Sequence, residues 1–246
     1  MKISVITATW NSALTVEDTI KSVISQDYSD IEYIIVDGAS TDSTLDLIKS
    51  YGDVVSTLVS EKDKGIYDAL NKGIALATGD VVGFLHSDDV FADERVISRV
   101  AEEFSKGCME AVYGDLDYVS RSDTTKIVRR WISGRFNRDK FRNGWMPPHP
   151  TFYLKRKHYV SLGGFNLKFS IAADYDSMLR YCWKNKINAG YIPEVLIKMR
   201  VGGESNRSLL NIFKKTREDR VAMIENGIRP MRGLLYKNLS KIQQFF

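Results

Sequence analysis

The chain has 246 residues, 43% hydrophobic and 27% charged, which is ordinary globular composition with length for one large domain or two small ones. Its 2 cysteines, Cys108 and Cys182, are too few to predict a disulfide framework or a zinc site, so a reducing compartment fits. The opening residues MKISVITATW lack the apolar core of a signal peptide, and no apolar run approaches the roughly 18 residues of a membrane span. We therefore expect a cytoplasmic protein.

Strand-like and helix-like segments alternate over the first 90 residues. Four apolar, β-branched runs predict buried strands, the second of them running into a turn, at residues 3–9, 31–40, 54–61 and 81–89. Apolar residues at helical spacing between these runs predict helices within residues 11–26, 41–51 and 66–77. This alternation indicates a doubly wound α/β sheet.

Beyond Asp89 the pattern is less regular. The sequence predicts a helix from Asp93 to Phe104, a strand and turn over 111–120, and a basic, aromatic, turn-rich stretch over 121–150. A helix over 173–185 would place four apolar side chains on one face, namely Tyr175, Met178, Leu179 and Cys182. Two final helices are expected around residues 211–227 and 231–246.

Positive charge gathers in residues 205–246, where nine Lys and Arg stand against three Asp and Glu, while the whole chain carries +4. Apolar side chains among these charges would suit a helix on a membrane surface or, as we favour, one packed on its own domain: Phe213, Leu234, Leu235, Leu239, Ile242 and Phe245. No nucleic-acid-binding motif is recognisable, so nucleic acid is not an expected partner.

Polar residues stand at the ends of three of the predicted strands. They are Thr7, Thr9 and Asn11 at the first, Asp37, Gly38 and Ser40 at the second, and His86, Ser87, Asp88 and Asp89 at the fourth. A single carboxylate at such a place is usually a turn or a helix cap. If the strands are parallel, however, all three groups face one crevice at the carboxyl edge of the sheet, where open α/β folds bind ligands.

A nucleotide-sugar would suit such a crevice only with a cation, because aspartates alone repel a diphosphate. Carboxylates that hold Mg²⁺ or Mn²⁺ reverse this repulsion, since the ion bridges to the phosphates. The first strand is not followed by G-x-G-x-x-G, and the chain has no P-loop lysine motif, so a dinucleotide fold and a P-loop fold are both disfavoured.

Four segments in order resemble the family 2 glycosyltransferases of GT-A fold, especially the bacterial branch that builds O-antigen and other surface polysaccharides: SVITATWN, IIVDGASTDST, EKDKGIYDALNKGIALATGD and GFLHSDDV. The resemblance resumes at HPTFYLKRKHYVSLGGFN and IAADYDSMLR, and reaches roughly Arg200. It implies a Rossmann-like, three-layer αβα domain over 1–204 with a mostly parallel central sheet. The nucleotide-binding half would span about 1–115 and the acceptor half about 116–204, with a basic helical tail over 205–246.

The resemblance also implies a role for each matching residue. The nucleotide-sugar would be bound by Thr7, Thr9, Asn11, Asp37, Gly65, Asp68, Asn71, His86 and Ser87. Asp88 takes the metal-ligand position for Mn²⁺ or Mg²⁺, with Asp89 beside it, while His86 stands where the family has its first aspartate. Asp174 matches the catalytic base, and Ala173 replaces the family's glutamate.

Three further residues are candidates for contact with the acceptor or the diphosphate: His149, Trp145 and Arg200. Each also has an ordinary structural interpretation, as a histidine beside prolines, a packed tryptophan and a solvent-exposed arginine. Asp174 itself could equally be the N-cap of the helix that follows it.

We therefore expect a metal-dependent, inverting transferase. It would move a hexose or N-acetylhexosamine from a UDP-sugar to an oligosaccharide or lipid-linked acceptor, such as a polyprenyl-diphosphate-linked sugar, with peripheral membrane contact through the tail. One alternative is a non-catalytic nucleotide-sugar-binding protein, because of His86 and Ala173. The other is a sugar-phosphate nucleotidyltransferase, although TATWNSAL lacks the glycine-rich basic loop that a triphosphate needs.

Overall fold

The computed structural model describes residues 1–202 and 209–229, which fold around one sheet of nine strands. The sheet order is β3-β2-β1-β4-β8-β6-β9-β5, and β7 pairs with β6 outside this path. Parallel pairing joins the first four strands in sequence, β1 (Ile3–Thr9), β2 (Ile31–Asp37), β3 (Thr57–Ser60) and β4 (Val81–Phe84). Their carboxyl ends consequently lie along one edge of the sheet.

The second half of the sheet mixes directions. Its strands are β5 (Val90–Phe91), β6 (Ala111–Val119), β7 (Ile127–Trp131), β8 (Tyr153–Lys155) and β9 (Ala189–Arg200). The long β6–β9 pairing is parallel, whereas β8 runs antiparallel to both β4 and β6. The long pairings of the sheet are therefore parallel, and the antiparallel ones are short.

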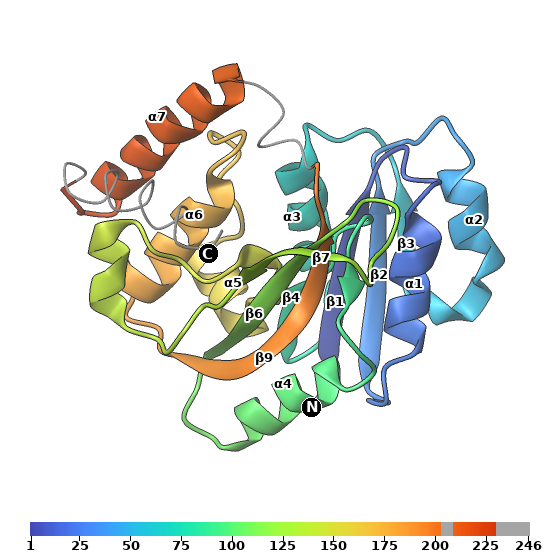
Figure 1. Cartoon of the computed structure of the whole chain (residues 1–246), viewed down its shortest axis with the longest axis horizontal. Helices are drawn as coiled ribbons and strands as arrows, with labels where there is room; N and C mark the ends of the chain where they lie inside the picture. Colours follow the sequence, from blue (N-terminus) through green and yellow to red (C-terminus); the bar gives the residue numbers. More distant parts are fainter. Residues whose placement is uncertain (203–208, 230–246) are drawn as a thin grey trace.

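Helices cover both faces of the sheet, as Figure 1 shows. One face packs against α1 (Val16–Ile24), α2 (Thr44–Ser50) and α4 (Val96–Ser105). The other packs against α3 (Ile66–Leu76), α5 (Arg156–Leu162), α6 (Ala173–Met178) and α7 (Leu209–Glu225). Successive strand residues alternate between the two cores, as Val5 and Ile6 do, which explains the continuous apolar strand sequences. The three-layer α/β prediction is confirmed.

Several boundaries differ from the sequence prediction. The fourth strand ends at Phe84 rather than at residue 89, because the chain turns at His86–Asp89 before forming β5. The third strand begins at Thr57, after a short 3-10 turn at Gly52–Val54. The stretch over 121–150 is not all loop, since it contains β7 and two 3-10 turns, at Arg138–Asn143 and His149–Thr151.

The predicted helix over 173–185 is confirmed as α6 followed by a wider π-helical turn at Leu179–Lys184, and its four apolar residues are all buried. Helix α7 confirms the helix expected around 211–227. The boundary at residue 204, the last predicted helix and the side chains of Phe213, Leu234, Leu235, Leu239, Ile242 and Phe245 lie outside what the structure describes. Within residues 1–202 and 209–229, no helix is long and apolar enough to span a membrane.

Candidate functional site

The polar strand ends meet at the carboxyl edge of the parallel strands. Thr9 is the register partner of Asp37, and Asp37 is the register partner of Ser60 on β3. Beyond β4, the Leu85 N–H still donates to the Ile6 carbonyl at 3.0 Å, so His86 follows at the same edge. The strands are therefore parallel, as the prediction of a shared crevice requires.

The loops after β1 and β2 are tied to each other. The Asn11 N–H donates to Ser40 Oγ at 2.8 Å, and Asn11 Oδ1 accepts from the Thr41 N–H at 2.8 Å. Asn11 and Ala39 both adopt the left-handed backbone region, with φ of 48° and 60°. Such strained conformations cost free energy and tend to occur at functional sites.

Asp37 and the two threonines of β1 differ in what they can offer a ligand. The buried Asp37 carboxylate accepts from Ser40 and from Ser60 Oγ, the latter at 2.6 Å. Thr7 is fully buried, and its hydroxyl donates to the Leu85 carbonyl at 2.7 Å. Thr9 Oγ1, by contrast, is buried without a hydrogen-bond partner among the described residues. Of these three groups, Thr9 is the one whose side-chain oxygen has no protein partner in the described structure.

The turn over 86–89 is held from behind by hydroxyl groups of the α1 region. Ser12 Oγ lies 2.9 Å from Ser87 Oγ, Thr15 Oγ1 donates to the Ser87 carbonyl at 2.8 Å, and Thr19 Oγ1 donates to the Asp89 carbonyl at 2.7 Å. These bonds hold the backbone from which the side chains of Asp88 and Asp89 extend.

Asp88 and Asp89 have different surroundings. Asp88 is partly exposed, whereas Asp89 is 1% exposed. Asp89 Oδ1 accepts from the Arg200 N–H at 3.3 Å, and Asp89 Oδ2 has no partner within the described ranges. Burial, and then the Asp88 carboxylate, raise the pKa of Asp89 well above its usual range. The N–H and the positive charge of Arg200 act in the opposite direction but do not outweigh these two effects.

His86 and His149 form a stacked pair at the same edge. Their ring centroids lie 5.9 Å apart, and His149 also stacks on Phe84 at 5.2 Å. Burial lowers the pKa of both rings, that of His149 to about 3, so both are neutral at pH 7. His86 Nδ1 and His149 Nε2 are buried without partners in the described structure. Buried polar atoms of this kind are rare, and they are where a ligand or water is expected.

Asp174 lies close to this pair, at the start of α6. The carboxylates of Asp88 and Asp174 both counteract the effect of burial on the pKa of His86. Asp174 Oδ1 accepts from the Tyr175 N–H at 2.7 Å, and the Tyr67 hydroxyl lies 3.5 Å from the same oxygen. The structure thus brings together His86, Asp88, His149 and Asp174, although 88 residues separate the first from the last.

The start of α3 borders this group through Tyr67. Gly65 precedes the helix with φ of 110°, a value that favours glycine, and Asp68 Oδ2 accepts from the Lys64 N–H at 3.0 Å. Asn71 bonds to both backbone groups of Phe165, at 2.7 Å through Oδ1 and 2.8 Å through Nδ2. The side-chain amide of Asn71 therefore joins α3 to the glycine turn before α6.

The remaining two acceptor candidates are engaged in packing. Trp145 lies in an aromatic cluster with Tyr113, Phe136 and Phe141. Arg200 is 6% exposed, and its guanidinium bonds to the Asp18 side chain and to the carbonyl groups of Asp88 and Arg121. Contact of either residue with a substrate stays a prediction.

Sequence reasoning gave no site role to Tyr67, Asp18 or Glu218. Tyr67 on α3 lies beside Asp174, Asp18 on α1 bonds to Arg200, and Glu218 on α7 bonds to the three residues before α6. Tyr67 stands next to the predicted Asp68, which was the available signal, whereas the other two offered none. In the part of the chain that the structure describes, no three His, Cys, Asp or Glu side chains are arranged to hold a metal ion.

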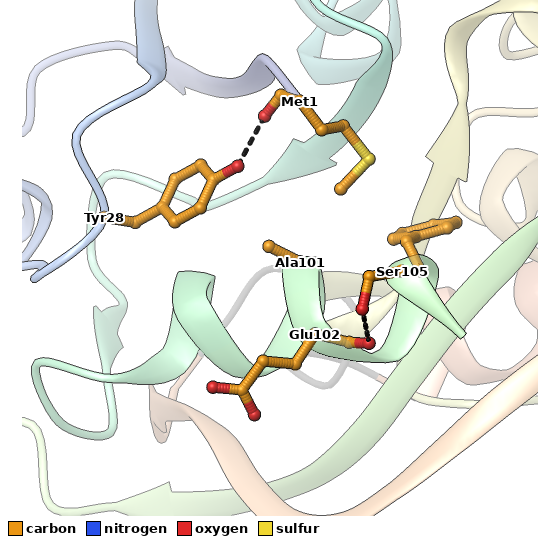
Figure 2. A pocket seen from close by; sticks show the side chains of 6 residues that line it. Met1, Tyr28, Ala101, Glu102 and Ser105 are labelled. Carbon is orange, nitrogen blue, oxygen red and sulfur yellow. Dashed lines mark hydrogen bonds between the residues drawn. The ribbon is translucent and has the colours of Figure 1, made fainter. Parts of the chain in front are cut away.

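Two surface hollows lie away from this edge. One, of about 350 Å³, is lined by Met1, Tyr28 and residues of α4, and Figure 2 shows the Tyr28 hydroxyl bonded to the Met1 carbonyl. Because Met1 precedes β1, this hollow lies at the opposite, amino edge of the sheet. The other, of about 480 Å³, lies between the start of β9 and Phe136.

Comparison with known proteins identifies related sequences. The family model described as glycosyl transferase family 2 matches residues 4–164. An uncharacterized glycosyltransferase of Mycobacterium tuberculosis is 33% identical over 187 residues, which cover 72% of this chain and 68% of the relative. A PGL/p-HBAD biosynthesis glycosyltransferase of Mycobacterium bovis is 31% identical over 186 residues, covering 74% of this chain and 70% of the relative.

Solved structures share the fold at low sequence identity. Residues 1–349 of S. aureus TarS, in complex with UDP-GlcNAc, match with a TM-score of 0.72 and 17% identity over 96% of this chain and 70% of that one. The mannosyltransferase PcManGT of Pyrobaculum calidifontis, in complex with GDP-Man and Mn²⁺, matches with a TM-score of 0.62 and 18% identity over 98% and 80%. The chain spans 44% of the longer TarS structure.

Proposed function

The chain belongs to glycosyltransferase family 2, and from this premise we propose that it moves a hexose or N-acetylhexosamine from a UDP-sugar to a saccharide acceptor, with inversion at the anomeric carbon. We place the reaction in the synthesis of a surface glycan, on an acceptor that is an oligosaccharide or a lipid-linked sugar. The M. bovis relative, named for PGL/p-HBAD biosynthesis, and the TarS complex with UDP-GlcNAc support this choice.

One observation carries the proposal. A chain of ring contacts links the turn that carries Asp88 to Asp174 on α6. His86 stacks on His149, and Phe165 contacts both His149 and Tyr67. The Tyr67 hydroxyl in turn lies 3.5 Å from Asp174 Oδ1. A displacement with inversion needs a group that holds the leaving diphosphate and a base beside the attacking hydroxyl. Asp88 and Asp174 offer these two functions from different elements that meet at one edge.

In this proposal, Asp174 is the general base. Its carboxylate takes the proton from the acceptor hydroxyl as that oxygen attacks the anomeric carbon, which requires a separation of about 3 Å in the complex. The Tyr175 N–H donates to Asp174 Oδ1 at 2.7 Å and orients the carboxylate, while Tyr67 holds the Ile171 carbonyl just before α6.

The donor lies against the ends of β1, β2 and β4. Thr9, Asn11, Asp37 and Ser87 border the nucleotide, with Gly65 and Asp68 at the start of α3 closing the other side. The unpartnered Thr9 Oγ1, His86 Nδ1 and His149 Nε2 are the buried polar atoms that donor groups would satisfy.

The carboxylates fit a divalent cation of the kind held partly by substrate. Mg²⁺ and similar ions are commonly bound by one or two carboxylates together with phosphate oxygens, so a site of three protein ligands is not required. Asp88 would hold the ion, with the unpartnered Asp89 Oδ2 beside it. When bound, Mn²⁺ or Mg²⁺ stabilises the negative charge of the leaving diphosphate as a Lewis acid.

Calorimetric titration tests this assignment. UDP, GDP and dTDP are titrated with and without Mn²⁺ into the wild type, Asp88→Ala and the control Asp53→Ala, which alters an exposed carboxylate near the start of β3. We expect UDP to bind the wild type and the control only with Mn²⁺, and Asp88→Ala to lose this binding. Equal UDP affinity in all three proteins, or none in the wild type, would refute the assignment.

A further inference from the structure

Helix α7 packs against α6, the helix that begins just before Asp174, and Figure 1 shows the two side by side. Ala222 and Met223 of α7 are fully buried in the same core as Met178 of α6. Asn226 Nδ2 donates to Asp176 Oδ1 at 2.9 Å across the two helices. Helix α7, which lies beyond residues 4–164 of the family match, is therefore part of the structure that supports Asp174.

One side chain of α7 binds the backbone directly before α6. Glu218 Oε2 accepts from the N–H groups of Ile171 and Ala172, at 2.8 and 3.0 Å. Glu218 Oε1 accepts from the hydroxyl and N–H of Ser170, at 2.8 and 3.2 Å. Ala172, at the N-cap of α6, has no polar side chain, and the Tyr175 N–H in the first turn is bound by Asp174 instead. The N–H groups that Glu218 accepts from belong to the three residues directly before α6, so Glu218 ties this segment to α7.

The segment before Asp174 is held from its other side by Tyr67. The Tyr67 hydroxyl donates to the Ile171 carbonyl at 2.7 Å, so the N–H of Ile171 is bound by α7 and its carbonyl by α3. Burial alone would raise the pKa of Glu218, but the N–H groups of Ile171, Ala172 and Ser170 lower it below its usual value. Glu218 is therefore ionised at neutral pH, and its bonds are charge-assisted.

We propose that Glu218 is a positioning residue for Asp174: through its bonds to residues 170–172 it fixes the start of α6, and thereby the carboxylate that removes the acceptor proton. The inference rests on the proposed role of Asp174 as base. It adds that residues of the C-terminal region belong to the transferase machinery.

The test compares two isosteric substitutions on the same helix. Glu218→Gln places an amide NH₂ group among N–H donors, so two of the four bonds lose their acceptor. Glu225→Gln is the matched control, because Glu225 pairs at the surface with Lys168. The measurements are release of UDP from UDP-N-acetylglucosamine, UDP-glucose and UDP-galactose, calorimetric UDP affinity, and amide hydrogen exchange over residues 170–176.

We expect Glu218→Gln to lower kcat about 10- to 100-fold, since small displacements of a catalytic group cost that much. The KM for the donor and the affinity for UDP should change less than about twofold, because the strand ends are untouched. Amides of residues 170–174 should exchange faster, and Glu225→Gln should match the wild type in all measurements. Tyr67→Phe, which releases the Ile171 carbonyl, should also speed amide exchange at residues 170–174. It replaces Glu218→Gln in the test if that variant does not fold.

Asp174→Asn, measured in parallel, separates the two proposals. If it turns over donor like the wild type, the proposed base is wrong. If Asp174→Asn is inactive while Glu218→Gln keeps the wild-type kcat, the base stands and the positioning role alone is refuted. Unchanged amide exchange at residues 170–174 in Glu218→Gln refutes the positioning role whatever the turnover.

Discussion

Arg200 Nη1 donates a hydrogen bond of 2.8 Å to the backbone carbonyl of Asp88. The end of β9 thereby holds the turn that carries the two carboxylates proposed to bind the cation. The same guanidinium bonds to the Asp18 side chain on α1 and to the Arg121 carbonyl, so all three of its nitrogen atoms are engaged with protein. Arg200 therefore holds the Asp88 turn in the free protein, whether or not it also contacts the diphosphate of the donor.

We predict that Asp18 and Arg200 act as one unit on donor binding. Arg200→Lys cannot keep three directed bonds, and we expect it to weaken UDP–Mn²⁺ binding about tenfold or more. Asp18→Asn should also weaken UDP–Mn²⁺ binding, but by a few-fold only, since half-exposed ion pairs contribute little. The two changes should be non-additive, because the residues are in direct contact. Calorimetry on the four proteins of this cycle gives the coupling.

The same cycle tests direct contact between Arg200 and the diphosphate. If that contact dominates, Asp18→Asn frees the guanidinium and leaves UDP–Mn²⁺ affinity unchanged or raises it. Such a result, or strict additivity of the two changes, would contradict a role through Asp88.

We predict that Asp174→Asn separates turnover from binding. The amide keeps the shape of the side chain but cannot accept a proton, so turnover should fall by about 100-fold or more. UDP affinity should stay within about twofold of the wild type. Asp46→Asn, at an exposed position of α2, is the control and should behave as the wild type does. Parallel loss of UDP affinity and turnover in Asp174→Asn would instead indicate damage to the donor site.

Local patterns predicted the strands and helices of this fold because apolar periodicity reflects burial on one or two faces. The same patterns placed Asp37 and Asp88 at strand ends, whereas Asp174 was singled out by the family resemblance. They could not show which polar atoms are already bonded, such as the Thr7 hydroxyl on Leu85, because these partners lie 78 residues apart. Nor could they connect Glu218 to Ala172 at the start of α6, 46 residues before it, since such contacts leave no periodic signal in the sequence.

Asn71 and Gly164 illustrate a packing constraint of this kind, from which we predict a stability effect. A Cβ on Gly164 would lie 2.2 Å from Asn71 Oδ1, while the Asn71 amide bonds to both backbone groups of Phe165. Gly164→Ala should therefore lower the free energy of unfolding by about 1–3 kcal/mol. Asn71→Ala should lower it by a similar amount, about 1–3 kcal/mol, because it leaves two buried backbone groups without partners.

The double variant is the decisive measurement, by urea unfolding. In the Asn71→Ala background the 2.2 Å approach is gone and only the 3.3 Å approach to Ile74 Cδ1 remains, so Gly164→Ala should cost clearly less than in the wild type. Additive losses would show that the close approach of these two residues does not set the cost. UDP affinity of Asn71→Ala, measured alongside, tests the separate prediction that Asn71 borders the nucleotide.

The stability of the parallel half should depend on pH through Glu32. This carboxylate lies 7% exposed on β2 and accepts from Lys2 Nζ at 2.8 Å, Ser4 Oγ at 2.6 Å and the Thr78 N–H at 2.7 Å. Burial alone would raise the pKa of Glu32, but these donors lower it from 4.5 to about 2. Because the folded state holds the ionised form more tightly, the stabilisation is complete above pH 4.5 and is lost as the pH falls towards 2.

The lowering of the Glu32 pKa from 4.5 to about 2 corresponds to a contribution of about 3 kcal/mol to the free energy of unfolding. Urea unfolding of the wild type and Glu32→Gln between pH 7 and 3 measures it. The difference in unfolding free energy should be constant near neutral pH and should shrink as the pH falls below 4.5, since Gln does not titrate. Glu110, whose pKa is also about 2, titrates in both proteins and cancels in this difference. A difference that stays constant down to pH 3 would show that the ionised Glu32 carboxylate does not stabilise this half of the sheet.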